Sequence, residues 1–325
     1  MKPARLILPL SLSLAMGATV EVAASETSIY ASLRQSLLFT DSGAASGDTD
    51  DFSVVDQGSR IGLQGNQSFG EFSGFGRFEV GFDSSLQNDD LEVRLGYVGV
   101  SGNFGIVSVG SQWSAWDTYV GGGDTNFVSE GDWQNGTGRN GSTLKYAGRV
   151  GEIAVEADAV LVSKGGANPA TGDAPNSGIL DELQLAVGYT IKGVTLNAAL
   201  IERDGGNTGY LGGGSLFGAR ISYERGPLGL SFAIAQDDMQ FGSDGEETLG
   251  MKFRASYTTG PHSFLAVMTS ADNEMAANQP LGVALGYQND LSQRSRVALE
   301  LSSVDPDIAG LDSSIEGGVM YRHDW

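Results

Sequence analysis

The stretch Ile153–Leu161 reads IAVEADAVL, and every second residue in it, beginning with Ile153, is apolar. Glu156 and Asp158 stand at positions between these apolar residues, so one side of the segment is apolar and the other carries charge. A period of two is that of an extended strand, whose successive side chains point to opposite faces. The stretch is therefore predicted to be a β-strand with one apolar and one polar face.

The same alternation recurs along the chain, and helical spacing does not fit it in Gly193–Leu200, Leu228–Ala235 or Arg294–Leu301. The connections between such stretches alternate between two kinds. The short ones comprise residues 102–103, 149–151, 192–193, 226–227, 259–261 and 289–292. The longer ones are polar and acidic and comprise residues 41–51, 112–141, 163–182, 204–214, 237–247, 272–280 and 305–312.

With a further turn at residues 65–70 and a further loop at 84–90, this order predicts about sixteen antiparallel strands of about ten residues each. Both termini then fall at the end with the short turns. The predicted fold class is all-β, a transmembrane antiparallel β-barrel, with residues 26–325 as one domain. A soluble β-sandwich also alternates apolar and polar residues, but it is not expected to separate short and long connections so regularly.

The first 25 residues have the composition of a secretory signal peptide. Lys2 and Arg5 precede an apolar run, Leu6–Val20, and small residues follow at Ala23–Ser25. A positive start, a short apolar core and a small-residue cleavage site are the features of such a signal. The alternative, a transmembrane anchor, is weakened by Pro9 and by the shortness of the run, since spanning needs about 20 apolar residues. We therefore expect residues 1–25 to be cleaved.

The composition excludes several classes of protein. The chain has 325 residues, 48 glycines, no cysteine and a formal net charge of -21. Absence of cysteine excludes disulfide scaffolds and thiolate metal sites, and the acidity argues against binding to nucleic acid. The two histidines, His262 and His323, are both expected at the short-turn end, away from the outer mouth. We therefore predict no catalytic site, metal site or cofactor.

Three motifs carry a resemblance to a known family. Residues Ser59–Gly65 read SRIGLQG, Arg94–Val100 read RLGYVGV, and the last eight residues, Gly318–Trp325, read GVMYRHDW. In this order and spacing they resemble the general diffusion porins of Gram-negative outer membranes. The resemblance implies a sixteen-stranded barrel, a homotrimer and passive diffusion through a water-filled pore. The chain departs from the family's pattern in two ways: it ends in Trp325 in place of the usual Phe, and its second outer loop is short. The short loop bears on whether a loop latches one subunit to the next, as in some members of the family.

The longest connection, residues 112–141, follows the fifth expected strand. The resemblance implies that this third loop folds into the barrel and narrows the pore. Residues Gly122–Thr125 read GGDT, similar to a motif of that loop in the family. Four acids in the segment are the candidates for the negative side of the constriction: Asp117, Asp124, Glu130 and Asp132. The competing interpretation of each acid is a solvated loop face.

Arginines on strands are the candidates for the positive side. Alternation assigns Arg60 to the lumen if Ile61 faces lipid, and Arg94 to the lumen if Leu95 and Tyr97 face lipid. The resemblance implies that Arg60 and Arg94 are constriction arginines. A ring of arginines that faces acids creates a transverse field across a narrow pore.

Three more arginines are candidates for the same ring. Alternation turns Arg34 and Arg77 inward, with Leu33 and Phe78 outward. Arg139 is assigned by the resemblance, from its place in a G-R-N sequence. The competing interpretation of each arginine is a structural ion pair on the inner wall.

The last strand is predicted to present an apolar stripe to lipid through Ile315, Val319, Tyr321 and Trp325. The resemblance implies that Tyr321 and Trp325 belong to the signal that the barrel-assembly machinery reads. The competing interpretation is a simple hydrophobic anchor. Other expected partners are outer-membrane lipid and lipopolysaccharide.

The expected function is passive diffusion of small hydrophilic solutes and ions, with a modest preference for cations because of the negative net charge. One alternative is a substrate-specific channel, for example for sugars, since Trp113, Trp116, Tyr119 and Trp133 lie in or near the third loop. Another alternative is a structural or adhesive surface barrel without an open pore. The acidic runs in the long connections match no calcium-loop motif and are expected to be solvated.

Overall fold

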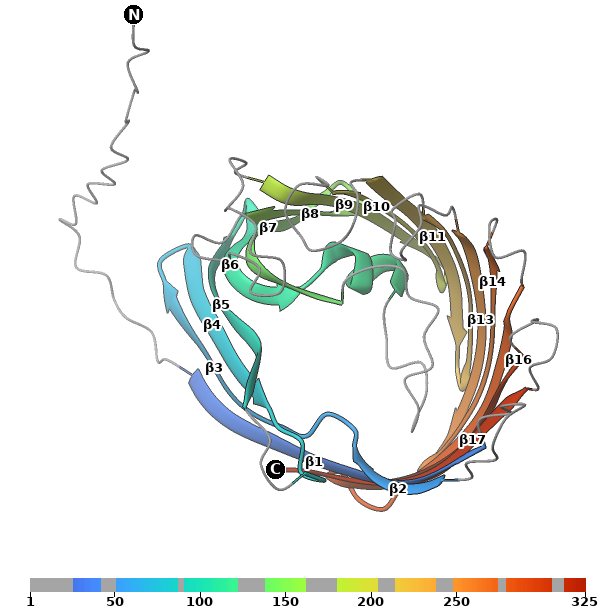
Figure 1. Ribbon diagram of the computed structural model, residues 1–325. Coiled ribbons are helices and arrows are strands. Elements are labelled where there is room, and N and C mark those ends of the chain that lie inside the picture. Colours follow the sequence, from blue (N-terminus) through green and yellow to red (C-terminus); the bar gives the residue numbers. More distant parts are fainter. Residues whose placement is uncertain are drawn as a thin grey trace, which may run out of the picture.

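The chain forms a ring of antiparallel strands around a wide lumen, as Figure 1 shows from one end of the ring. The computed structural model describes residues 26–41, 51–86, 91–121, 138–161, 180–203, 214–237, 248–273, 279–305 and 313–325. The expected signal peptide therefore lies outside the described residues. The all-β class predicted from the alternation is confirmed.

The described strands are longer than six residues with one exception, β2. In chain order they are β1 (Glu26–Asp41), β2 (Asp51–Asp56), β3 (Arg60–Phe69), β4 (Phe72–Gly81), β5 (Glu92–Gly102), β6 (Gly105–Trp113), β7 (Arg139–Val150), β8 (Ile153–Leu161), β9 (Leu180–Ile191), β10 (Val194–Arg203), β11 (Gly214–Arg225), β12 (Leu228–Asp237), β13 (Thr248–Thr259), β14 (His262–Asn273), β15 (Leu281–Asp290), β16 (Ser295–Asp305) and β17 (Ser314–Asp324). A short π-helical turn, η1 (Asp117–Gly121), follows β6.

The ring closes because β1 pairs with β17 along one edge, with Ser32 opposite Asp324. Along its other edge β1 pairs with both β2 and β3, which follow one another in line. Gln35 lies opposite Asp56 and Ser32 lies opposite Arg60, so the register slips by one residue between the two segments. The seventeen strand segments therefore make sixteen barrel strands within the described part of the chain, as the sequence predicted.

The outer surface of the barrel is apolar. Large apolar side chains at alternate positions are exposed, among them Leu37, Ile61, Phe78, Val109, Leu144, Leu185, Phe217, Ile221, Phe253, Phe264, Leu285, Leu299 and Val319. Their strand neighbours, such as Glu79, Ser108, Asp158 and Glu300, are buried inside. This inverts the pattern of a soluble protein and is typical of a barrel whose outside meets lipid and whose inside is polar.

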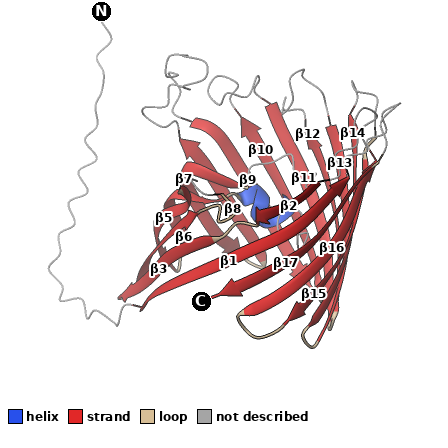
Figure 2. Ribbon diagram, turned by 60° about the horizontal axis from the view of Figure 1, so that its bottom comes forward, coloured by secondary structure: helices blue, strands red, loops and turns tan. Residues whose placement is uncertain are grey.

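Short turns close the strands at one end, which Figure 2 shows in tan below the tilted strands. Gly151, Gly193, Gly226 and Gly260 adopt positive φ in these turns, a conformation that suits glycine. His262 begins β14 beside one such turn, and His323 pairs with the first residue of β16. Both histidines thus lie at the short-turn end, as expected. No helix in the described ranges is long and apolar enough to cross a membrane.

One alternation assignment is wrong. Leu95 is 0% exposed, and Tyr97 lines a hollow on the inner wall, so neither residue faces lipid. The cause is a β-bulge in the pairing of β4 with β5, between Glu79 and Val80. The bulge places Arg94 and Leu95, although adjacent in sequence, both on the inner side. Arg94 therefore points inward as predicted, but for a different reason.

The described start of the segment between β6 and β7 lies inside the lumen. The first strand ends at Trp113 and the second begins at Arg139, so the connection is slightly shorter than the predicted 112–141. Its described part includes η1, the green coil inside the ring in Figure 1, which contacts β9, β10 and β11. Trp116 and Val120 are buried there against Ala199, Ile201 and Leu216 of the wall.

Candidate functional site

The inner wall formed by β1, β3, β4 and β5 is built as three rows of side chains. The pairing registers place Glu26, Asn66 and Phe75 in the first row, and Ser28, Gln64, Arg77 and Tyr97 in the second. The third row contains Tyr30, Gly62 and Glu79. Because facing residues of neighbouring strands lie about 5 Å apart, long side chains in adjacent rows can meet.

Glu79 is the centre of the third row and is 2% exposed. Its carboxylate accepts hydrogen bonds from Arg94 Nε at 2.9 Å, Arg77 Nη2 at 2.9 Å and the Tyr30 hydroxyl at 2.7 Å. Arg60 Nε lies 3.9 Å from the same carboxylate. Arg77 Nε also donates to the Tyr30 hydroxyl at 2.8 Å. Three of the five predicted arginines are thus brought together around one carboxylate, Glu79, which was not among the predicted site residues.

The other two predicted arginines lie elsewhere. Arg34 is buried on the inner side of β1, where its Nε donates to Ser32 Oγ at 3.2 Å. The Arg139 guanidinium lies over the Trp113 ring, 5.5 Å from its centroid. The next residue, Asn140, donates a hydrogen bond from its side-chain amide to Glu182 of β9 at 3.0 Å.

Polar side chains of the wall hold the backbone of the loop that contains η1. The Ala115 N–H donates to Asp158 of β8 at 2.7 Å, and the Trp116 N–H donates to Gln184 of β9 at 2.9 Å. Asn197 of β10 donates to the Tyr119 carbonyl at 2.8 Å. Three consecutive strands therefore fix the start of the loop against the wall.

Two wall positions need glycine because loop side chains pack directly on the backbone. A Cβ at Gly218 of β11 would overlap the Trp116 ring and lie 2.8 Å from Val120. A Cβ at Gly188 of β9 would lie 2.9 Å from the Tyr119 ring. Burial, followed by the negative charge of Glu156, raises the pKa of the Tyr119 hydroxyl, which keeps it neutral.

This packing removes Trp116 from the aromatic residues that the sugar-channel alternative invoked. Trp116 is 1% exposed and faces the wall, so it offers no ring to a passing solute. Trp113 is covered on one side by Arg139, and Trp133 lies outside the described residues.

Behind the loop, the wall carries a second set of paired charges. Lys145 of β7 forms ion pairs with Glu156 and Asp158 of β8. Arg203 of β10 pairs with Glu182 of β9. Here two basic side chains pair with three carboxylates on adjacent strands, and one of these carboxylates, Asp158, also holds the backbone of the loop.

The predicted acids of the loop fall into two groups. Asp117 begins η1, its backbone N–H donates to Ser114 Oγ at 2.9 Å, and its charge acts on Arg220 of β11. The positions Asp124, Glu130 and Asp132 lie outside the described residues, so their place in the constriction stays a prediction.

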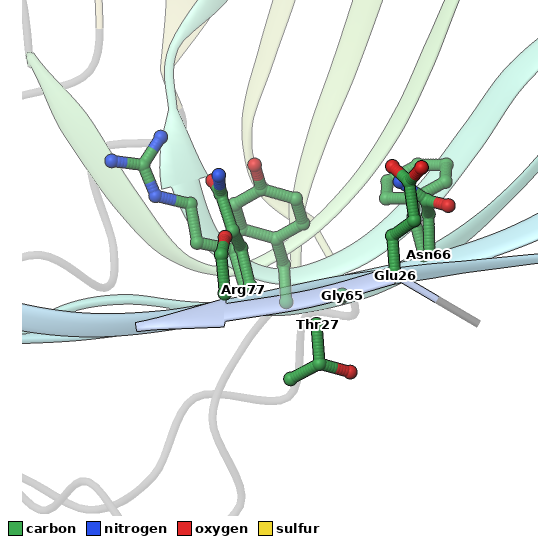
Figure 3. A pocket seen from close by; sticks show the side chains of 10 residues that line it. Glu26, Thr27, Gly65, Asn66 and Arg77 are labelled. Atoms are coloured by element: carbon green, nitrogen blue, oxygen red, sulfur yellow. The ribbon is translucent and has the colours of Figure 1, made fainter. Parts of the chain in front are cut away.

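A hollow of about 360 Å³ lies on the wall beside Arg77, toward the chain start. Figure 3 shows Glu26 and Asn66 on one side of it and Arg77 on the other, while Thr27 points away. The rings of Phe75 and Tyr97 also line it and lie 6.3 Å apart, edge to face. The hollow thus combines aromatic surface with amides and both signs of charge. It was not predicted, because alternation had assigned Tyr97 to lipid.

A further basic cluster lies across the barrel and was also missed. Arg220 of β11 and Lys252 and Arg254 of β13 all stand at inward positions, because their neighbours Ile221, Met251 and Phe253 are exposed outside. Alternation alone assigns all three to the lumen. What brings them together is the register through β12, which the sequence does not reveal.

The last strand carries the predicted apolar stripe. Ile315, Val319, Tyr321 and Trp325 are all exposed on the outside. The Trp325 ring lies 4.5 Å from the His323 ring, and its backbone N–H donates to Ala31 of β1 at 3.0 Å. The C-terminus is therefore part of the seam that closes the barrel.

A closed barrel with an apolar outside, a charged inside and an inserted loop has the architecture of an outer-membrane channel. The family model described as "Gram-negative porin" matches residues 11–308. The chain belongs to the Gram-negative porin family. This porin is therefore an integral outer-membrane protein and a channel for passive diffusion. Among curated protein sequences, none matches the chain.

Solved structures share the fold of this porin. The anion-selective porin from Comamonas acidovorans is similar, with a TM-score of 0.75 at 17% identity over 93% of this chain and 100% of that chain. OmpT of Vibrio cholerae, in its trimer form, has a TM-score of 0.70 at 19% identity, over 93% of this chain and 100% of that chain. OmpF of Salmonella typhi, in complex with daunomycin, has a TM-score of 0.69 at 12% identity, over 92% of this chain and 97% of that chain. At these identities the likeness concerns the fold alone.

Proposed function

We propose that this porin is a general diffusion channel that passes small hydrophilic solutes and ions according to size. The single observation that carries the proposal is the inner wall, which is lined by charged and hydroxyl side chains and narrowed by a loop fixed to β8–β10. A wall of this kind favours hydrated solutes, since apolar ones must lose hydration to enter. Nothing in the proposal requires a catalytic group.

The proposal is tested by the rate at which proteoliposomes swell in solutes of graded size. A general channel gives rates that fall smoothly with solute size and do not saturate with concentration. Saturation by one class of solute contradicts it. Absence of swelling and of any single-channel conductance from the folded protein instead supports a structural barrel without an open pore.

Within this channel, we propose that Arg60, Arg77 and Arg94 form the positive side of the constriction and that Asp117 contributes to the negative side. The three arginines stay close together because Glu79 holds them, and together they exceed its charge. The variants Arg60→Ala and Arg94→Ala are expected to raise single-channel conductance or change ion selectivity. Arg225→Ala, at an exposed position near a short turn, is the matched control. Currents like those of the wild type in both constriction variants contradict the assignment.

We retain the prediction of a modest preference for cations, which is based on the formal net charge of -21. Negative charge around a pore raises the local concentration of cations. The reversal potential in a potassium chloride gradient across a planar bilayer measures the preference. A potential that favours chloride contradicts it; the similar porin from Comamonas acidovorans is itself anion-selective.

A second candidate function is a sugar-type specific channel, and the hollow beside Arg77 favours it. Phe75 and Tyr97 offer aromatic surface, and Gln64 and Asn66 offer amide groups to hydroxyls. The swelling assay separates the two candidates. A specific channel saturates with its sugar, and the variant Tyr97→Ala then loses the saturation without loss of bulk conductance.

Assembly of this porin is proposed to follow the family. We infer cleavage of residues 1–25, recognition of Tyr321 and Trp325 by the barrel-assembly machinery, and association with lipopolysaccharide. A homotrimer is supported by the trimer form of Vibrio cholerae OmpT. Electrophoresis without heating tests the trimer, and mass spectrometry of the exported protein tests the cleavage site.

A further inference from the structure

We propose that Arg220, Lys252 and Arg254 form an anion-binding site on the inner wall of β11–β13, which holds a small oxyanion such as phosphate or a carboxylate during passage. The inference rests on the proposed function only in assuming that solutes reach the lumen. It concerns a part of the wall separate from the Glu79 cluster of β3–β5.

The strand register gathers the three cations around a floor of small residues. Ala233 of β12 lies opposite Arg220 on one side and Lys252 on the other. Ser231, two residues along β12, lies opposite Arg254. With about 4.8 Å between strands, the backbones of Arg220 and Lys252 are about 10 Å apart, and Arg254 is about 7 Å along the strand from Lys252.

The side chains on the floor are too short to fill the space between the basic ones. Ala233 is 4% exposed and Lys252 is 7% exposed, so this part of the wall is largely shielded from bulk water. Ser231 and Ser222 face each other on β12 and β11 and offer hydroxyl groups beside Arg254. Three basic residues and two serines thus share this stretch of the inner wall.

The charge of this wall is incompletely balanced at Arg254. Its Nε is buried without a hydrogen-bond partner, and no ion pair joins Arg254 to a carboxylate within the described part of the chain. The charges that act on it are Glu224 and the like charge of Arg220. Keeping like charges together away from bulk water is unfavourable, and an incoming anion relieves this cost.

The groups present define the class of ligand. Guanidinium groups match oxyanions through paired N–H donors, and an ammonium group adds a point charge. The site lies near the constriction, because Trp116 of the inserted loop packs on Gly218, two residues before Arg220. The ligand expected here is therefore a hydrated oxyanion small enough to pass the loop.

The experiment measures the current of the full-length protein in planar bilayers while inorganic phosphate is added at constant ionic strength, and repeats this with malonate. Wild type is expected to show a saturable decrease in current. In the double variant Arg254→Gln, Lys252→Gln, the half-effective concentration is expected to rise about tenfold or more, as for a loss of charge-assisted contacts. The reversal potential is expected to shift toward cations. Arg225→Gln and Lys192→Gln, both at exposed positions near short turns, are the matched controls.

The outcomes separate this site from the channel function. The site is overturned if each anion decreases the current of wild type and double variant equally and the reversal potential does not change between them. The channel function stands in that case. An effect of phosphate alone restricts the ligand to phosphate. Absence of conductance in folded wild type overturns the channel function, and calorimetry of phosphate with the detergent-solubilised protein then decides the site. Binding by wild type that the double variant lacks supports it, and equal or absent binding overturns it.

Discussion

Two parts of the inner wall carry three cationic residues each, and they differ in one side chain on the central strand. On β3–β5, Glu79 stands among Arg60, Arg77 and Arg94 and accepts hydrogen bonds from two of them. On β11–β13, the equivalent central strand carries Ala233. The first cluster is therefore held together by a carboxylate on its central strand, whereas the charges of Asp117 and Glu224 act on the arginines of the second.

The difference shows that inward arginines in a barrel are not all of one kind. The two interpretations open at the level of sequence, pore lining and structural ion pair, both apply to the β3–β5 cluster, since Glu79 fixes side chains that still bear excess positive charge. Fixed guanidinium groups lose little entropy when a solute passes. On β11–β13 the central strand offers no carboxylate, which leaves room there for an arriving anion.

The largest expected effect comes from removing the carboxylate of the β3–β5 cluster. The variant Glu79→Ala leaves three clustered cations and the half-buried Tyr30 hydroxyl without their common acceptor. Loss of one partner of a buried charge cluster costs about 3 kcal/mol or more. We expect a matching decrease in the free energy of unfolding in urea, measured by tryptophan fluorescence on protein refolded into lipid vesicles.

The exposed Glu71, beside a short turn, provides the control Glu71→Ala with the same change in charge. A Glu79→Ala protein as stable as this control refutes the view that Glu79 organises the cluster. If Glu79→Gln restores much of the stability, hydrogen bonding rather than charge dominates.

Sequence alone predicted the barrel, its strand number and the inward direction of Arg34, Arg60 and Arg77, because a period of two determines which residues share a face. It did not predict the bulge in β4–β5, which depends on how two strands pair, and so Leu95 was assigned to the wrong side. Alternation is a property of one strand at a time.

The two clusters could not be predicted for a related reason. Glu79, Arg220, Lys252 and Arg254 each show inward parity, but which of them meet is decided by register across two or three strands. Register follows from turn lengths and bulges that single-strand patterns do not contain. The resemblance to porins pointed to Arg60 and Arg94, and it carried no information on β11–β13.

A second comparison concerns two glycines of the wall, Gly218 near the β11–β13 cluster and Gly62 in the β3–β5 cluster. A Cβ at Gly218 overlaps the Trp116 ring of the inserted loop, and a Cβ at Gly62 lies 2.7 Å from Tyr30 Cε1. Overpacking of this kind costs about 1–3 kcal/mol. Gly218→Ala is expected to displace the loop and change single-channel conductance, whereas Gly62→Ala leaves the loop in place and changes conductance less.

The control is Gly317→Ala, where the nearest atom lies 3.6 Å from the added Cβ. Stability and conductance are both expected to remain at wild-type values there. Equal conductance in Gly218→Ala and wild type contradicts the direct packing of the loop on β11.

A more selective test converts the second cluster into the first. The variant Ala233→Glu places a carboxylate between Arg220 and Lys252, as Glu79 stands among its arginines. We expect the effect of phosphate on the current to disappear, because the new carboxylate pairs with the basic groups in place of the anion. Ala233→Gln has the same size without the charge and is expected to retain part of the phosphate effect. A full phosphate effect in Ala233→Glu contradicts the site.

The smallest expected effect concerns the stability of single arginine variants, and it is the one that separates the clusters most directly. Arg94→Gln breaks a hydrogen bond to buried Glu79 and is expected to cost about 1.5–3 kcal/mol, the range for hydrogen bonds to charged groups. Arg254→Gln breaks no ion pair within the described residues and removes repulsion with Arg220, so its free energy of unfolding should stay within about 0.5 kcal/mol of wild type. Urea unfolding in vesicles at low salt measures both. A loss at Arg254 as large as that at Arg94 means that Arg254 is bound within the wall, and the contrast between the two clusters then fails.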